Sequence, residues 1–204
     1  QSATNGVWGD PVMMVDNEGN YYFFHLSSPA VGNWIDRIVC QKSTDGGQTW
    51  NDGSYMGLNG TKAQDKEWVT IDRKNGTIYC TWTQFDDYGS SNPNDRSNIL
   101  FSKSTDSGES WSAAKRINEV DGDCIDSDNT VEGAVPALGP EGQIYVAWAG
   151  PAGIVFDKSY DQGETWLEND IFVTDFPEGW DYAIPGISRA NGLPVTCCDT
   201  SYNE

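Results

Sequence analysis

Ser43-Thr44-Asp45-Gly46-Gly47-Gln48-Thr49-Trp50 is the stretch that decides the fold of this chain, because its pattern returns at residues 104–111 and 159–166. All three copies read Ser-x-Asp-x-Gly-x-Thr/Ser-Trp, and one copy occurs in each repeating unit of roughly 50–60 residues. Asp and Ser favour a tight turn, Gly accepts a positive φ, and Trp supplies apolar surface that fixes the turn against its neighbours. We interpret the copies as structural turns, because a site rarely needs three identical ones. Their defining residues are Ser43, Asp45, Gly47, Trp50, Ser104, Asp106, Gly108, Trp111, Ser159, Asp161, Gly163 and Trp166.

The residues around each octapeptide also repeat, as four short apolar runs per unit. The octapeptide falls between the third and fourth runs, so each unit is predicted to be a four-stranded antiparallel sheet. Units of this kind predict the blades of a β-propeller. We expect an all-β chain of about three and a half blades, at residues 7–60, 66–120 and 131–175 with a partial fourth blade at 181–204.

The octapeptide resembles the Asp box, or bacterial neuraminidase (BNR) repeat, of sialidases and related β-propeller proteins. The resemblance spans nearly the whole chain and implies that the box joins the third and fourth strands of a blade. Propellers typically have four to eight blades, so we expect the remainder of the propeller to be a partner of this chain. The resemblance also implies a secreted protein, extracellular or at the cell surface.

The sialidase reaction itself is not supported by the residues present. The resemblance implies an arginine triad for the substrate carboxylate, a Tyr–Glu nucleophile pair and an Asp acid/base. Where the first arginine belongs, the chain reads Trp8-Gly9-Asp10-Pro11, with Gly in its place. Arg37 and Arg96 each follow an aspartate, Asp36 and Asp95, and each is expected to form a local ion pair.

Composition limits the partners. Thirty-one acidic residues against twelve basic ones give a net charge of −19, whereas nucleic acids and anionic membranes need a basic surface. The most apolar window, residues 135–156, contains prolines and glycines and is not expected to be a transmembrane helix. The start at Gln1 lacks a signal-peptide pattern, so any signal peptide has been removed or was never included. Cys40 and Cys80 are expected to be buried free thiols.

Long connections on the face opposite the octapeptides are the expected place for a site, since function usually lies on variable loops held by a rigid frame. Trp34, Tyr88 and Trp180 fall in these connections, where exposed aromatic rings could stack on sugars. The alternative is that each ring packs against its own loop. The connections span residues 27–35, 59–66, 84–98, 118–134, 149–153 and 175–182.

Four acids fall near the starts of the innermost strands, which line the central channel of a propeller. Paired carboxylates at the channel mouth could serve as general acid and base in sugar chemistry. The alternative is a polar lining filled with water. The four candidates are Asp10, Glu67, Glu132 and Asp181.

Residues 121–132 hold five carboxylates. Oxygen-rich loops suit Ca²⁺, which takes six to eight oxygen ligands. The candidate ligands are Asp121, Asp123, Asp126 and Asp128, and a solvated acidic loop is the alternative. No other cofactor is predicted.

The sequence favours a sialidase-like propeller module that engages glycans, with glycoside hydrolysis open only to the full-length protein. The alternative is a non-catalytic protein-binding or adhesion propeller within a larger secreted protein, and a structural spacer is a third possibility. The sequence does not identify catalytic residues, because a fold does not fix its function.

Overall fold

The computed structural model describes residues 3–176, 179–180, 182–188 and 190–201. In this part of the chain, strands form three four-stranded antiparallel sheets and no helix is present. The first sheet contains β1 (Gly9–Val15), β2 (Tyr21–Ser27), β3 (Arg37–Ser43) and β4 (Ser54–Met56). The second contains β5 (Ala63–Ile71), β6 (Ile78–Phe85), β7 (Ser97–Ser104) and β8 (Lys115–Arg116). The third contains β9 (Glu132–Leu138), β10 (Ile144–Gly150), β11 (Gly153–Ser159) and β12 (Ile171–Thr174).

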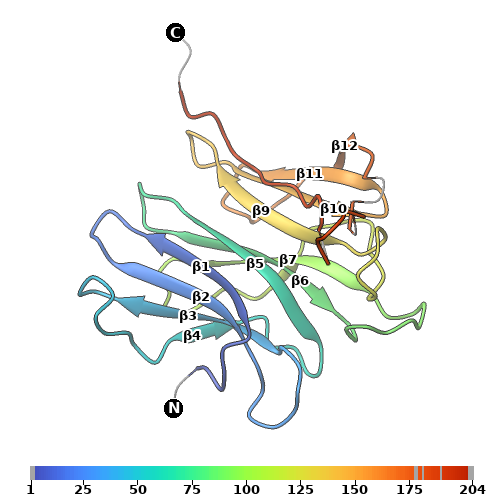
Figure 1. Ribbon diagram of the computed structural model, residues 1–204. Helices are drawn as coiled ribbons and strands as arrows, with labels where there is room; N and C mark the ends of the chain where they lie inside the picture. The colour runs from blue at the N-terminus through green and yellow to red at the C-terminus, as the bar shows by residue number, and fades with distance from the viewer. Residues whose placement is uncertain (1–2, 177–178, 181, 189, 202–204) are drawn as a thin grey trace.

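The sheets follow one another as the blades of a partial β-propeller, with β1, β5 and β9 as neighbouring innermost strands (Figure 1). Strand order within each sheet follows the sequence, so each strand pairs antiparallel with the next one along the chain. The predicted all-β propeller with four-stranded blades is confirmed. The second sheet begins at Ala63, before the predicted blade start at residue 66.

The fourth unit differs from its prediction. A partial fourth blade was predicted at residues 181–204, but the described residues of this segment form no strand, and Asp181 lies outside the described residues. A strand needs a continuous ladder of backbone hydrogen bonds to a neighbour. Here the contact is made by a side chain instead, since Thr196 Oγ1 accepts a hydrogen bond from Ala147 N at 3.0 Å. The segment runs past β9, where Leu193 lies against Gly133.

In every sheet the octapeptide joins the third and fourth strands as a turn held by its own side chains. In the third copy, Asp161 Oδ1 accepts from the amide of Thr165 at 2.8 Å and Asp161 Oδ2 accepts from its hydroxyl at 2.6 Å. Ser159 Oγ accepts from the Gly163 amide at 2.8 Å. The hydrogen bonds from Thr165 lower the pKa of Asp161 to about 2. The first two copies repeat the arrangement and likewise lower the pKa of Asp45 and Asp106 to about 2.

The second and third octapeptides pack on the blade before them. Gly108 has a φ of 81° and Gly163 a φ of 83°, and each presents its bare Cα to the preceding sheet. A Cβ on Gly108 would lie 3.1 Å from Cys40 Sγ, and one on Gly163 would lie 2.2 Å from the ring of Phe101. No side chain fits at Gly163 without displacing that ring, so the turn and its neighbour fix each other.

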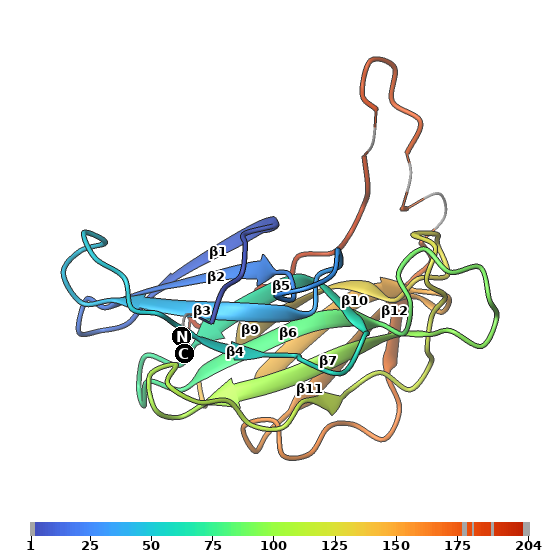
Figure 2. The ribbon, with the colours of Figure 1, turned by 90° about the horizontal axis from the view of Figure 1, so that it is seen from below.

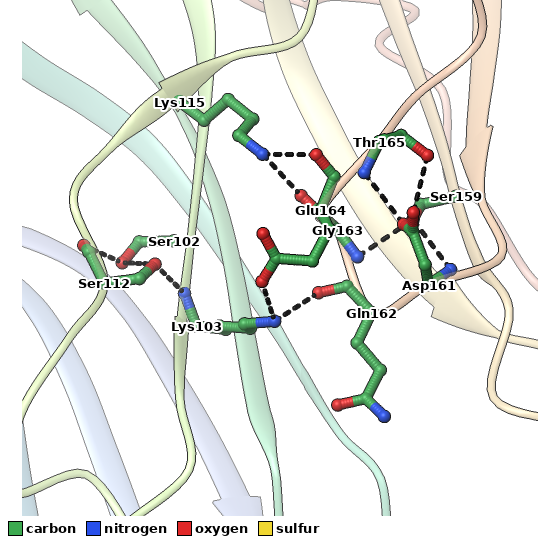
Figure 3. A network of polar contacts seen from close by, with 10 residues as sticks. All are labelled: Ser102, Lys103, Ser112, Lys115, Ser159, Asp161, Gln162, Gly163, Glu164 and Thr165. Carbon is green, nitrogen blue, oxygen red and sulfur yellow. Dashed lines mark hydrogen bonds and ion pairs between the residues drawn. The ribbon is translucent and has the colours of Figure 1, made fainter.

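Trp and Lys side chains complete these contacts between blades. Trp111 lies edge-on to Phe24 and donates from Nε1 to Ser54 Oγ at 2.9 Å. On the next blade, Lys103 Nζ bonds the Gln162 carbonyl and Glu164 Oε1 at 3.0 and 2.7 Å (Figure 3). These bonds attach each turn to the strands of the previous sheet.

The apolar core lies between the sheets. Tyr22, Phe24 and Trp82 are buried between the first and second blades, and Tyr79 and Trp148 between the second and third. All five cysteines are free, and Cys40 and Cys80 are buried as predicted. Among the described residues there is no helix long and apolar enough to cross a membrane.

Substitution of the octapeptide glycines should separate backbone strain from packing between blades. Gly47 has the same positive φ as Gly163 but only Trp50 near a built Cβ, at 3.7 Å. Gly47→Ala should therefore cost about 1 kcal/mol of strain. Gly163→Ala should cost about 3 kcal/mol or more, because it also overpacks Phe101. Denaturant unfolding of both variants measures the difference, and equal losses would contradict the close packing.

The Trp residues of the octapeptides should also differ in how much they stabilise the fold. Their equivalence in sequence predicts a similar loss of about 3–5 kcal/mol of unfolding free energy for each Trp→Ala variant. Trp50 is 37% exposed and contacts Phe23 of its own blade. Trp111 is partly buried against the preceding blade. We expect about 1 kcal/mol for Trp50→Ala and about 3 kcal/mol for Trp111→Ala by the same unfolding measurement. A Trp50 loss as large as that of Trp111 would argue against this packing.

Candidate functional site

A β-bulge interrupts each innermost strand at the end where the chain enters from a long connection. The register shifts between Gly9 and Val12 in β1, between Asp65 and Trp68 in β5, and between Glu132 and Val135 in β9. A bulge sets two residues opposite one and redirects the side chains around it. Three bulges therefore lie at one end of adjacent strands, which follow one another in the order β1, β5 and β9 (Figure 2).

The bulges place the predicted acids in different registers. Asp10 and Lys66 occupy the same bulge position, with φ values of 47° and 54°, and form an ion pair of 3.3 Å between β1 and β5. Glu67 follows one residue later, whereas Glu132 precedes the bulge of β9. The structure thus brings three of the four candidates to one end of the inner strands, and Asp181 lies outside the described residues.

The environment of Glu67 strongly perturbs its pKa. The residue is 1% exposed, and neither carboxylate oxygen has a hydrogen-bond partner among the described residues. Burial raises the pKa of Glu67 to about 9; its own amide and Lys66 oppose this effect, and Asp10 and Asp65 add to it. Glu67 therefore carries a proton at neutral pH.

Glu67 lines a cavity of about 410 Å³ between the inner strands, which we call the axial cavity. Asp10 from β1, Lys66 from β5 and Gly133 from β9 contribute to its wall. Leu193 and its neighbours in the last described segment close one side. A protonated acid in such a cavity can donate a hydrogen bond or a proton to a bound molecule.

A second cavity, of about 610 Å³, lies between the long connections of the first two blades, and we call it the loop-face cavity. Its size falls within the range of about 300–1,000 Å³ that is usual for ligand sites. Aromatic rings and acids make up much of the wall. They are Trp8, Trp34 and Tyr88 with Asp65, Asp86 and Asp87.

Of the aromatic residues in this wall, Tyr88 is held by a side-chain hydrogen bond and Trp34, within the described chain, is not. Tyr88 donates from its hydroxyl to Asp126 Oδ2 at 2.6 Å and lies edge-on to Phe85. Burial, followed by this bond, raises the pKa of Tyr88 well above its usual value. The indole N–H of Trp34 is buried without a hydrogen-bond partner among the described residues. Trp34 thus offers its ring to a ligand, while its indole N–H is buried.

Asp65 connects the two cavities through the bulge of β5. It lines the loop-face cavity, while the next two residues, Lys66 and Glu67, line the axial one. Burial raises the pKa of Asp65, the Lys66 ammonium opposes this, and Asp10 adds to it. The two cavities therefore share one set of interacting charges.

Other predicted residues lie elsewhere. Arg37 pairs with Asp36 at 2.7 Å, as predicted. Arg96 pairs with Asp121 at 2.6 Å rather than with the adjacent Asp95, so that part of the prediction is wrong. The predicted exposed aromatic Trp180 is only 5% exposed, and it lines neither cavity.

The candidate calcium ligands are each engaged separately. Asp121 pairs with Arg96, and Asp123 accepts from the hydroxyls of Ser127 and Thr130 at 2.7 and 2.6 Å. Asp126 bonds Tyr88, and Asp128 Oδ1 accepts from Trp180 N at 3.1 Å. Within the described ranges, no three His, Cys, Asp or Glu side chains are grouped so that they could hold a metal ion.

Sequence reasoning missed several residues of the walls. Trp8, Asp65 and Lys66 were not singled out because the inner strands were predicted to begin after them, at the apolar runs. Gly9 and Gly133, both with positive φ in bulged strands, were the available signal. Asp86 and Asp87 lie in a predicted long connection beside Tyr88 and were passed over as surface charge.

No family model and no curated protein sequence matches this chain. Solved structures do match it. The NanB sialidase of Streptococcus pneumoniae superposes with a TM-score of 0.59 and 11% identity, over 85% of this chain and 45% of that one. For the Hadza microbial sialidase Hz136 the TM-score is 0.54 and the identity 16%, over 78% and 36%. For the GH43 β-1,3-galactosidase BT3683 the TM-score is 0.51 and the identity 14%, over 83% and 65%.

These likenesses place the chain among the β-propeller folds. At such identities they show the fold alone. The chain spans less than half the length of the two sialidases.

Removal of the Glu67 carboxyl should change how stability depends on pH. In the unfolded chain this residue ionises near the ordinary pKa of 4.5, whereas in the folded chain burial raises its pKa to about 9. Stability is therefore lost as pH rises through this window. Glu67→Gln should not show this loss. Between pH 4 and pH 7 the wild type should lose about 3 kcal/mol of unfolding free energy that the variant keeps. Unfolding between pH 4 and 9 measures it, with the exposed Glu141→Gln as control. Parallel pH curves for wild type and Glu67→Gln would contradict the raised pKa.

Proposed function

We propose that this chain is a glycan-engaging module of a sialidase-like propeller, and that the loop-face cavity binds the sugar. The observation that carries the proposal is the convergence of three aromatic residues with acids from separate connections in one cavity. Aromatic faces pack against the C–H faces of sugar rings, and carboxylates accept hydrogen bonds from sugar hydroxyls. The names of the structurally similar sialidases and galactosidase support the same class of ligand.

Glycoside hydrolysis is a second candidate, and it rests on Glu67. A carboxyl group that is protonated at neutral pH beside ionisable acids is what a general acid requires. Glu67 lines the axial cavity with Asp10, and Asp65 lies across the bulge. The described residues do not group an arginine triad, so the proposal does not extend to sialic acid hydrolysis.

The proposal includes a further blade of the same kind beside β12. The ring of Tyr145 stacks on that of Phe156 on the outer face of the third sheet, at positions where Tyr22 and Tyr79 are covered by the next blade. Phe172 on β12 is 59% exposed. Extracellular placement is part of the same proposal and rests on the likeness to sialidases.

Sugar binding should depend on Trp34. A glycan array probed with the chain should identify bound sugars, and calorimetry with one of them should show at least about tenfold weaker binding for Trp34→Ala. Tyr160→Ala is the matched control, because Tyr160 is an aromatic residue 66% exposed on the octapeptide face. Melting curves confirm that both variants fold. An array without any bound glycan would favour the protein-partner alternative.

A further inference from the structure

We propose that the loop-face cavity selects sugars without an acidic group and binds amino sugars at least as tightly as neutral ones. This inference rests on the proposed glycan binding and concerns the charge of the ligand. It is drawn from which charged side chains face the cavity and which are already paired.

The wall of the cavity is acidic. Asp65, Asp86 and Asp87 line it, and none of its described lining residues is Lys or Arg. The two lysines that flank lining residues in the sequence are engaged by protein acids. Lys62 Nζ lies 2.6 Å from Asp86 Oδ1, and Lys66 Nζ lies 3.3 Å from Asp10 Oδ2.

The arginines that the neighbouring connections supply are also paired. Arg37 donates from Nε and from the terminal nitrogen to both oxygens of Asp36, at 2.8 and 2.7 Å, and its guanidinium lies over the ring of Tyr55. Arg96 and Arg116 share Asp121. A sugar carboxylate entering the cavity would have to break one of these pairs, leaving a protein carboxylate uncompensated.

The aromatic residues act in the same direction as the acids. The faces of Trp8, Trp34 and Tyr88 carry negative potential, which attracts an ammonium group and repels a carboxylate. A neutral sugar loses nothing by entering, since its hydroxyls can donate to the aspartates. A sugar acid, in contrast, meets the like charge of Asp65 and Asp87, and such juxtaposition lowers affinity strongly.

The test compares each glycan with its own charge variants. An array would present every backbone in neutral, amino and uronic acid forms, at about pH 6 so that the amine is protonated. For any backbone that binds, the acidic form should bind at least about tenfold more weakly than the neutral one, and the amino form no more weakly. Added salt should narrow the gap.

Two variants assign the selectivity to the cavity. Asp87→Asn removes an exposed charge from the wall and should reduce the neutral-to-acidic affinity ratio at least about threefold. Asp65→Asn should act in the same direction. Glu18→Gln removes one charge from the exposed turn between β1 and β2 on the octapeptide face and should leave the ratio unchanged.

The outcomes separate this inference from the proposed function. Binding of acidic forms as tightly as neutral ones, or weaker binding of amino forms, overturns the charge selection while leaving glycan binding intact. An equal response of Asp87→Asn and Glu18→Gln also overturns it, because the net charge of the chain and not the cavity would then be responsible. A chain that binds no backbone in any form counts against the proposed function itself.

Discussion

Close contact between a glycine turn and the sheet of the preceding blade is the constraint on which the rest of the structure depends. The octapeptide holds its own shape through the hydrogen bonds of its Asp and Ser, so it reaches the neighbouring sheet as a preformed unit. Gly163 can then approach the ring of Phe101 where no side chain would fit. Because the glycine has no Cβ, the distance between blades is set by backbone against ring. Lys103 and Lys115 bond the same turn and add polar contacts that fix its orientation.

The position of the candidate site follows from this stacking. Blades held at a constant spacing bring β1, β5 and β9 together, and their bulges then lie at the same end. The ion pair between Asp10 and Lys66 joins two blades. Burial lowers the pKa of Lys66, but Asp65, Asp10 and then Glu132 on the third blade raise it above its usual value. None of these residues is near another in sequence. Their proximity is a property of the assembled blades.

Local chemistry explains what could be predicted from the sequence. Turn residues and apolar runs encode the octapeptides, the strands and the propeller, because each depends on neighbours a few positions away. The bulges could not be predicted in the same way, because a bulge exists only relative to the paired strand. In β5, for example, Lys66 and Glu67 lie opposite the single residue Trp82. The pairing of Arg96 with Asp121 shows the same limit. A distant partner with better geometry prevailed over the adjacent Asp95.

The fold does not require an acid at the position of Glu67. The equivalent bulge positions of the other blades hold Pro11 and Ala134, so packing of the inner strands does not require an acid. A buried carboxyl without a partner lowers stability relative to an apolar residue. Sequences break such a local rule mainly at functional sites. Glu67 also lines the axial cavity together with Asp10, with its carboxylate oxygens buried in the wall. Among the three bulges, that of β5 alone holds an acid at this position, although β9 buries Glu132 just before its bulge. This difference within a repeating fold supports a role of the β5 bulge in binding or chemistry.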